Sequence, residues 1–170
     1  MSREALGNAQ YDLSRRTHAM AIQATYAHTN LIARDWQKLS AFYQSVFGCV
    51  PVPPERHLSG SDLERGTGVA GSEIHGVHLR LPGFGERGPT LEIFTYTRLA
   101  EGTAPAVNKP GLGHIAFGVK DVAEARNAVI QAGGGMVGDV VTIELPTGAK
   151  VTWCYVHDPE GNIIELQSWS

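Results

Sequence analysis

The sequence predicts an α+β fold built from two copies of a βαβββ module. Two segments carry the same order of local signals, "HTNLIARDWQKLSAFYQSVFG" at 28–48 and "HIAFGVKDVAEARNAVIQAGG" at 114–134. In each, a histidine opens an apolar run, an aspartate follows seven residues later, and a glycine follows thirteen residues after the aspartate. Runs that are typical of strands come after both segments. Although only these three positions are identical, the recurring order indicates a repeated unit.

Each half continues from its first strand into a helix that begins at an aspartate. Asp35 and Asp121 precede stretches whose apolar residues follow helical spacing, and a carboxylate there accepts free backbone N–H groups. Glu124, three residues after Asp121, completes a pattern that resembles a capping box. Gly48 and the glycines at 133–135 are predicted to end the helices, because glycine adopts left-handed backbone angles easily.

Strand-like runs complete the modules, at 76–81 and 90–96 in the first half and at 136–145, 151–158 and 162–169 in the second. Segments 82–89 and 158–161 have the composition of turns. The predicted organisation is an N-terminal arm at 1–22, a first module at 23–100, a linker at 101–111 and a second module at 112–170. Segment 51–73 is predicted as a long polar loop that serves as a substrate lid, a surface excursion or a dimer contact.

Composition excludes several classes of partner. The chain has 170 residues, a net charge of −3 and no basic run, so neither nucleic acid nor an anionic membrane surface is an expected partner. No apolar run approaches the roughly 20 residues of a membrane-spanning helix. The two cysteines, Cys49 and Cys154, form no CxxC pair, so we expect no disulfide framework and a cytoplasmic location.

Four side chains in repeated positions form the candidate site. His28 and His114 open equivalent strands, and Glu92 and Glu165 stand among apolar residues in "TLEIF" and "NIIELQ". A carboxylate in such surroundings is costly to bury without a partner, and a divalent cation is an effective one. Two imidazoles and two carboxylates supply four ligands for zinc, nickel, cobalt, manganese or iron and leave positions for water or substrate. The alternative is that each is an ordinary strand residue with a local hydrogen bond.

At these residues the sequence resembles the vicinal oxygen chelate superfamily, which includes glyoxalases, methylmalonyl-CoA epimerases, extradiol dioxygenases, fosfomycin resistance enzymes and bleomycin-binding proteins. The resemblance covers roughly residues 25–169, and its matching pieces are "HTNLIARDWQKLSAFYQSVFGC", "LEIF", "GLGHIAFGVKD" and "DPEGNIIELQSW". It implies cupped mixed sheets around one divalent transition metal ion, held by His28, Glu92, His114 and Glu165.

The resemblance also implies a reaction class. Family members chelate a small substrate through two neighbouring oxygens and stabilise an enolate-like intermediate, with Glu165 or Glu92 as the base. The presence of Glu92 favours a glyoxalase-like lyase or isomerase. In the glutathione-dependent members that the sequence resembles, arginines stand at the positions of Ile32 and Pro110. A glutathione adduct is therefore not the expected substrate. An iron(II) extradiol-type dioxygenase and a non-catalytic binding or resistance protein remain as alternatives.

Further polar residues are candidates for contact with the substrate. Alternation along the strand at 73–81 places His78 and Arg80 on one face and His75 on the other, and Tyr155 lies on the strand before Glu165. We predict that Arg80, His78 and Tyr155 bind substrate, against the alternative of solvated surface positions. The expected partners are a small-molecule substrate and, by analogy with the family, a second copy in a homodimer. The four ligands meet either within one chain or across a swapped dimer, and the sequence leaves both open.

Overall fold

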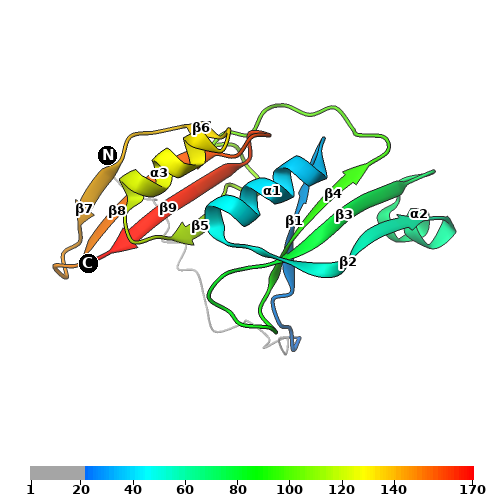
Figure 1. The fold of residues 1–170 in the computed structure, drawn as a ribbon, viewed down its shortest axis with the longest axis horizontal. Coiled ribbons are helices and arrows are strands. Elements are labelled where there is room, and N and C mark those ends of the chain that lie inside the picture. Colours follow the sequence, from blue (N-terminus) through cyan, green and yellow to red (C-terminus); the bar gives the residue numbers. More distant parts are fainter. Residues whose placement is uncertain (1–21) are drawn as a thin grey trace, which may run out of the picture.

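The computed structural model describes residues 22–170, so the predicted arm at 1–22 lies outside the described residues except for its last position. The first half contains β1 (His28–Ile32), α1 (Trp36–Phe47), β2 (Val50–Ser59), α2 (Ser61–Thr67), β3 (Glu73–Arg80) and β4 (Thr90–Tyr96). The second half contains β5 (Ile115–Gly118), α3 (Val122–Gln131), β6 (Gly135–Met136), β7 (Val141–Glu144), β8 (Lys150–His157) and β9 (Ile163–Trp169). Figure 1 shows both halves along one elongated molecule.

The strands form two mixed sheets. The first has the order β1-β4-β3-β2, and the second has the order β5-β9-β8-β6, with β7 also paired to β8. In each sheet the opening strand runs parallel to the last strand of its module, and the other pairs are antiparallel. The predicted α+β fold of two βαβββ-like modules is therefore confirmed.

The two main helices begin as their local signals predict. Asp35 is the N-cap of α1 and accepts a hydrogen bond from the backbone N–H of Lys38, and Asp121 does the same for Glu124 at the start of α3. Gly48 ends α1 in the left-handed region, with φ of 69°. Ala132 is the C-cap of α3, and the positive φ falls on the next residue, Gly133. These caps satisfy backbone groups that a helix end leaves free.

Segment 51–73 is not a loop, as the sequence predicts, but most of β2 and the whole of α2. Its prolines suggest irregular chain because proline cannot donate to a strand ladder. The structure accommodates them because β2 is the edge strand of its sheet, with a register shift between Val52 and Arg56. The prediction that this segment covers a substrate stays a prediction.

One hydrophobic core serves both modules. Figure 1 shows α3 over β8 and β9 and α1 at the middle of the molecule, and α1 contacts β3 and β4 of its own sheet. The ring of Phe47 at the end of α1 stacks on Phe117 of β5, with ring centroids 3.9 Å apart. The fully buried Leu91 and Ile93 of β4 belong to the same cluster as Leu166 of β9. The faces of the two sheets that carry these residues are thus joined through the helices.

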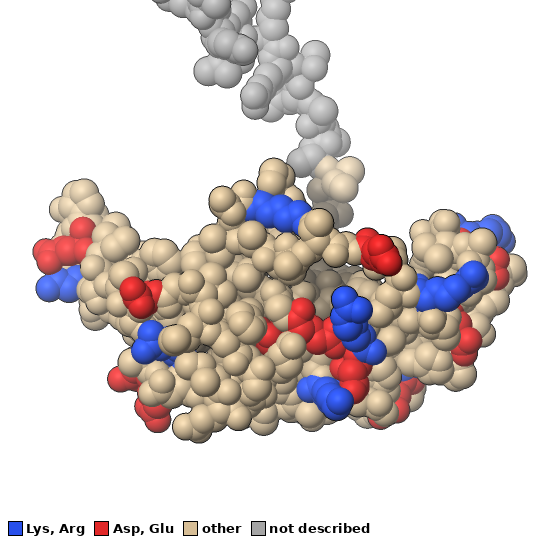
Figure 2. All heavy atoms as spheres, turned by 90° about the horizontal axis from the view of Figure 1, so that it is seen from above, with Lys and Arg blue, Asp and Glu red and all other residues tan. Residues whose placement is uncertain are grey.

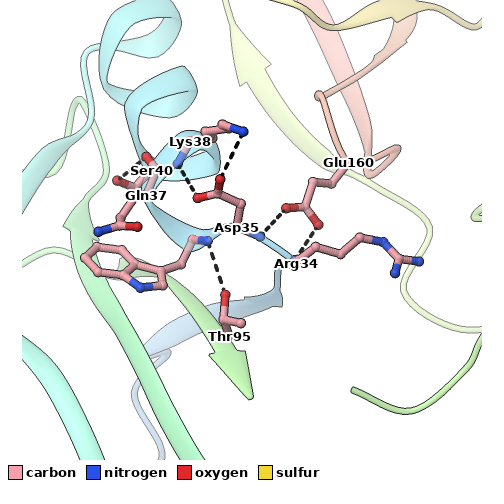
Figure 3. Close-up of polar contacts among 8 residues, drawn as sticks. Arg34, Asp35, Gln37, Lys38, Ser40, Thr95 and Glu160 are labelled. Carbon is pink, nitrogen blue, oxygen red and sulfur yellow. Dashed lines mark hydrogen bonds and ion pairs between the residues drawn. The ribbon is translucent and has the colours of Figure 1, made fainter. Parts of the chain in front are cut away.

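The turn between β8 and β9 also joins the modules. The Glu160 carboxylate accepts hydrogen bonds from the backbone N–H groups of Arg34 at 2.7 Å and Asp35 at 2.8 Å, just before α1 (Figure 3). Thr95 of β4 accepts a third such bond, from the N–H of Trp36 at 3.2 Å. A residue of the second module therefore holds the start of the first module's helix.

Charges on the described surface are mixed in sign. On the face drawn in Figure 2, basic side chains stand among acidic ones over the described residues. Within residues 22–170, no helix combines the length and the apolar character needed to cross a membrane.

Candidate metal centre

The first pair of predicted ligands lies on the first sheet, on the face turned away from the helices, which we call the helix-free face. Because side chains alternate along a strand, Glu92 points away from the core that Leu91 and Ile93 enter. Nδ1 of His28 lies 3.3 Å from Oε1 of Glu92. Nε2 of His78, the residue paired with Glu92 on β3, lies 3.2 Å from the same oxygen. One carboxylate oxygen thus lies between two imidazoles.

The pKa of His78 depends on the burial of its ring and on the neighbouring Glu92. The Glu92 side chain is only 11% exposed. Desolvation lowers the pKa of the His78 imidazole, and the charge of Glu92 opposes this shift in part. The lowered pKa favours the neutral imidazole, the form in which a ring nitrogen accepts a proton or a cation.

The second pair lies at the equivalent place on the second sheet. Nε2 of His114 is 2.9 Å from Oε2 of Glu165. Tyr155 pairs with Glu165 across the β8–β9 ladder, and its ring centroid is 5.1 Å from that of His114. Trp153 continues the same face, packed edge-on against Tyr155. This pair therefore stands beside two aromatic rings, whereas the first pair has Phe94, packed edge-on against His78, on its face.

The two pairs do not merge into one cluster within a single chain. Among residues 22–170, the one group that brings three potential ligand atoms within 4.8 Å of one another is His57, Glu73 and His75. Each predicted pair nevertheless offers one imidazole nitrogen and one carboxylate oxygen side by side, which is the donor chemistry of a borderline divalent cation. We call His28 and Glu92 the first half-site and His114 and Glu165 the second half-site. The donor atoms of each half-site fit a metal ion.

The other predicted site residues fall on the same faces. Arg80 pairs with Thr90, which pairs with His28, so the three form one row across the helix-free face of the first sheet. The Nε atom of Arg80 is buried and has no hydrogen-bond partner in the described part of the chain. Ile32 lies two strand positions beyond Asn30 on this face and is 47% exposed. Arg80 thus offers a hydrogen-bond donor close to the first half-site.

Three neighbours of the half-sites are not predicted from the sequence. Asn30 pairs with Glu92 and approaches its backbone carbonyl, with Nδ2 3.5 Å away. Trp153 and Gln167 pair with each other on the face of Glu165. Strand alternation alone would have placed these residues, because each is two positions from a predicted site residue. Their polar or aromatic side chains complete the surroundings of the two pairs.

Two cavities lie beside the linker between the modules. A cavity of about 850 Å³ opens between the segment 99–107 and the junction of the sheets, and its lining includes Ile32, His157 and Glu160. A smaller one, of about 60 Å³, reaches His114 and Leu31. Of the predicted ligands, His114 lines the smaller cavity, while the side chains of Glu92 and Glu165 are only 11% and 19% exposed.

The chain is similar to one protein family over most of its length. The sequence profile described as "Glyoxalase/Bleomycin resistance protein/Dioxygenase superfamily" matches residues 25–166. No curated protein is a significant match in sequence.

Solved structures share the fold at low sequence identity. A glyoxalase family protein from Bacillus cereus has a TM-score of 0.68 and 18% identity, over 88% of this chain and 95% of that chain. A fosfomycin resistance protein from Listeria monocytogenes has a TM-score of 0.56 and 16% identity, over 88% and 96%. A glyoxylase/bleomycin resistance protein/dioxygenase domain from Frankia has a TM-score of 0.54 and 18% identity, over 88% and 100%. At these identities the likeness concerns the fold.

Proposed function

Since the chain belongs to the glyoxalase/bleomycin resistance protein/dioxygenase superfamily, we propose that it is a metal-dependent lyase or isomerase for a small substrate with two neighbouring oxygens. One observation carries the proposal: each sheet places an imidazole beside a carboxylate on its helix-free face. The distances are 3.3 Å for His28 and Glu92 and 2.9 Å for His114 and Glu165. The same residue types at the same place in both modules are unlike a chance surface pair.

In this proposal a symmetric homodimer completes the site. His28 and Glu92 of one copy meet His114 and Glu165 of the other, so two equivalent sites form around a two-fold axis. Among residues 22–170 the four side chains do not form one group of close ligand atoms, and this supports the arrangement. Four protein ligands would hold one divalent transition metal ion per site and leave positions for the substrate oxygens.

The bound cation would supply Lewis-acid stabilisation of the oxyanion that develops on the substrate. Of the two carboxylates, Glu165 is the better base. Its side chain is 19% exposed and has the His114 ring as its ion-pair partner, whereas Glu92 is 11% exposed and lies between two imidazoles. Glu165 Oε2 would take the proton from the carbon beside the substrate carbonyl and return it to the neighbouring position.

Polar and aromatic neighbours would orient the substrate. Arg80 has a buried Nε without a partner in the described chain, so it is suited to an anionic substituent of the substrate. The rings of Tyr155 and Trp153 would shield the reacting carbon from water. His78 would hold the Glu92 carboxylate in place for the metal, as outer residues of metal sites commonly do.

Metal content tests the proposal. Protein purified without a histidine tag is analysed by mass spectrometry, as wild type and as His114→Ala and Glu165→Gln. We expect the wild type to hold about one equivalent of transition metal per chain more than either variant. Glu144→Gln, an exposed carboxylate of the same sheet, serves as the control and should keep the metal. Wild-type protein that after reconstitution holds no more metal than these two variants would overturn the proposal in favour of a non-catalytic binding protein.

A dioxygenase is the second candidate, and the position of Tyr155 favours it. The phenol lies on the face of Glu165 and against the His114 ring, where an acid–base group for an oxygen-activating reaction would be useful. Oxygen consumption with a catechol, measured on iron(II)-loaded protein, separates the two functions. Turnover of the catechol supports the dioxygenase, and its absence in metal-loaded protein supports the lyase or isomerase.

A further inference from the structure

Two histidines and a glutamate converge at the far end of the first sheet, away from the half-sites. His57 of β2 pairs directly with His75 of β3, and their ring centroids are 4.0 Å apart. Nε2 of His57 lies 2.7 Å from Oε1 of Glu73, and Nε2 of His75 lies 3.3 Å from the same oxygen. Three potential ligand atoms thus lie within 4.8 Å of one another.

The distances are close to those around a zinc ion. Bonds of about 2.0–2.1 Å at a tetrahedral centre put neighbouring ligand atoms about 3.3 Å apart. His75 and Glu73 already have this separation. The contact between His57 and Glu73 needs to lengthen by about 0.6 Å, which the His57 side chain can allow because it is 63% exposed. Two imidazoles and one carboxylate favour zinc or a similar transition metal over calcium or magnesium, which prefer oxygen ligands.

This cluster is separate from the candidate metal centre. Glu73 and His75 alternate with Ile74 and Gly76, so they share the face of Val77, which enters the core under the helices. Glu92 and His78 point to the opposite face of the same sheet. His75 also lines a cavity of about 310 Å³ beside the N-terminus of α1, so water and small solutes reach its imidazole.

We propose that His57, Glu73 and His75 bind a second divalent transition metal ion, of the zinc type, which fastens the segment between β2 and β3. The proposal does not depend on the proposed function. His57 precedes α2 and Glu73 follows it, 16 positions along the chain. Residues 61–67, which form α2, include no buried side chain, so packing contributes little to holding the helix. A cross-link that closes such a loop stabilises it by restricting its unfolded states.

Zinc binding tests the proposal in a background that lacks the other histidine ligands. Chelator-treated His28→Ala/His114→Ala protein is titrated with zinc chloride by calorimetry and equilibrium dialysis. We expect one zinc ion per chain, lost when His57→Gln or His75→Gln is added. Glu73→Gln should weaken binding at least about tenfold, because it removes one of three ligands. Glu55→Gln changes an exposed carboxylate on the same strand as His57 and should leave binding intact.

Limited proteolysis gives a second measurement on the wild type. Arg65 of α2 is 81% exposed and is a trypsin site within the fastened segment. We expect zinc to slow cleavage after Arg65 several-fold in the wild type and not in His57→Gln, with cleavage after Arg87, in a separate turn, unchanged. The proposal is overturned if His28→Ala/His114→Ala protein binds no zinc, or if it still binds zinc after His57→Gln is added. It is also overturned if the rate of cleavage after Arg65 in the wild type is the same with and without zinc.

Discussion

The Tyr43 hydroxyl donates a 2.9 Å hydrogen bond to Oδ2 of Asp158, and the two residues belong to different modules. Tyr43 lies on α1 and Asp158 at the end of β8, and both are fully buried. Oδ1 of Asp158 accepts from the backbone N–H groups of Glu160 and Asn162, and Oδ2 also accepts from the Asn162 side-chain amide. Tyr43 therefore completes the partners of a buried charge, and this bond fixes the helix of one module on the turn of the other.

Removal of this hydroxyl should destabilise the protein. Tyr43→Phe keeps the ring in the core but removes one of the two donors to Oδ2 of a buried carboxylate, leaving only the Asn162 amide. Because hydrogen bonds to charged groups contribute about 1.5–3 kcal/mol, we expect the free energy of unfolding in urea to fall by that amount. Tyr26→Phe, at a position 65% exposed, is the matched control and should change it by less than about 0.5 kcal/mol. Equal effects of the two changes would contradict a structural role for the bond.

The same residue predicts how stability depends on alkaline pH. Burial, and then the charge of Asp158, raise the pKa of Tyr43 well above its ordinary value of 10.0. Above about pH 10 an unfolded tyrosine loses its proton while the folded one keeps it, so ionisation favours unfolding. The contribution of Tyr43 is complete below that pH and is lost as the pH rises through the raised folded pKa. The difference in free energy of unfolding between wild type and Tyr43→Phe should therefore be smaller at about pH 11 than at about pH 8. A gap of constant size over that range would contradict this assignment.

Local signals in the sequence predict the helices and strands better than the contacts between the two modules. Asp35 and Asp121 cap helices because a cap needs only the next few residues, and both are predicted correctly. Tyr43 lies in the stretch after Asp35 whose apolar residues follow helical spacing, and the predicted helix is correct. The partner of the Tyr43 hydroxyl lies 115 positions away, so no local pattern reveals the bond. The fold follows from repeated local patterns, whereas the contacts between modules depend on how those patterns pack.

The candidate site shows the same division. Alternation of strand residues predicts that Glu92 and Glu165 leave the core, and the structure places a histidine beside each. Whether the two pairs meet depends on the relation between the sheets, which residue spacing does not encode. The cluster at His57 was not predicted because it needs the exact register of β2 against β3. A register shift between Val52 and Arg56 sets that register, and the prolines nearby hide the strand from sequence analysis.

The contact between Glu160 and the start of α1 should also contribute to stability. Its carboxylate satisfies two backbone N–H groups at the positive end of the helix, so Glu160→Ala should lower the free energy of unfolding by about 1 kcal/mol. Glu160→Gln should cost less, because the amide oxygen still accepts one bond. Glu144→Ala, which removes an exposed ion pair with Lys150, provides the comparison and should be nearly neutral. Urea unfolding measures all three, and a neutral Glu160→Ala would argue against the contact.

Both cysteines should be inert in the folded protein. Burial raises the pKa of the Cys49 thiol to about 11 and also raises the pKa of Cys154. With a pKa near 11, only about one Cys49 thiol in a thousand is ionised at pH 8, and the thiolate is the reactive form. We expect a thiol-reactive disulfide reagent to modify neither residue until urea unfolds the protein, and then to modify both. Rapid reaction of one thiol under native conditions would indicate local opening of the core.

Mixed dimers would distinguish a shared metal site from one built within a single chain. All copies carry His57→Gln, so that the cluster of His57, Glu73 and His75 holds no metal. In this background His28→Ala and His114→Ala each break one half-site, so each homodimer should bind little metal. If each site joins the first half-site of one copy to the second half-site of the other, a dimer of the two variants contains one site with both halves intact. The co-expressed mixed dimer, isolated with two different removable tags, should therefore recover metal at one site of its two. A dimer of His114→Ala with Glu165→Gln, which breaks the same half-site in both copies, is the control and should recover none. Recovery in neither mixed dimer would contradict the shared site, because ligands that meet within one chain cannot be restored by a partner.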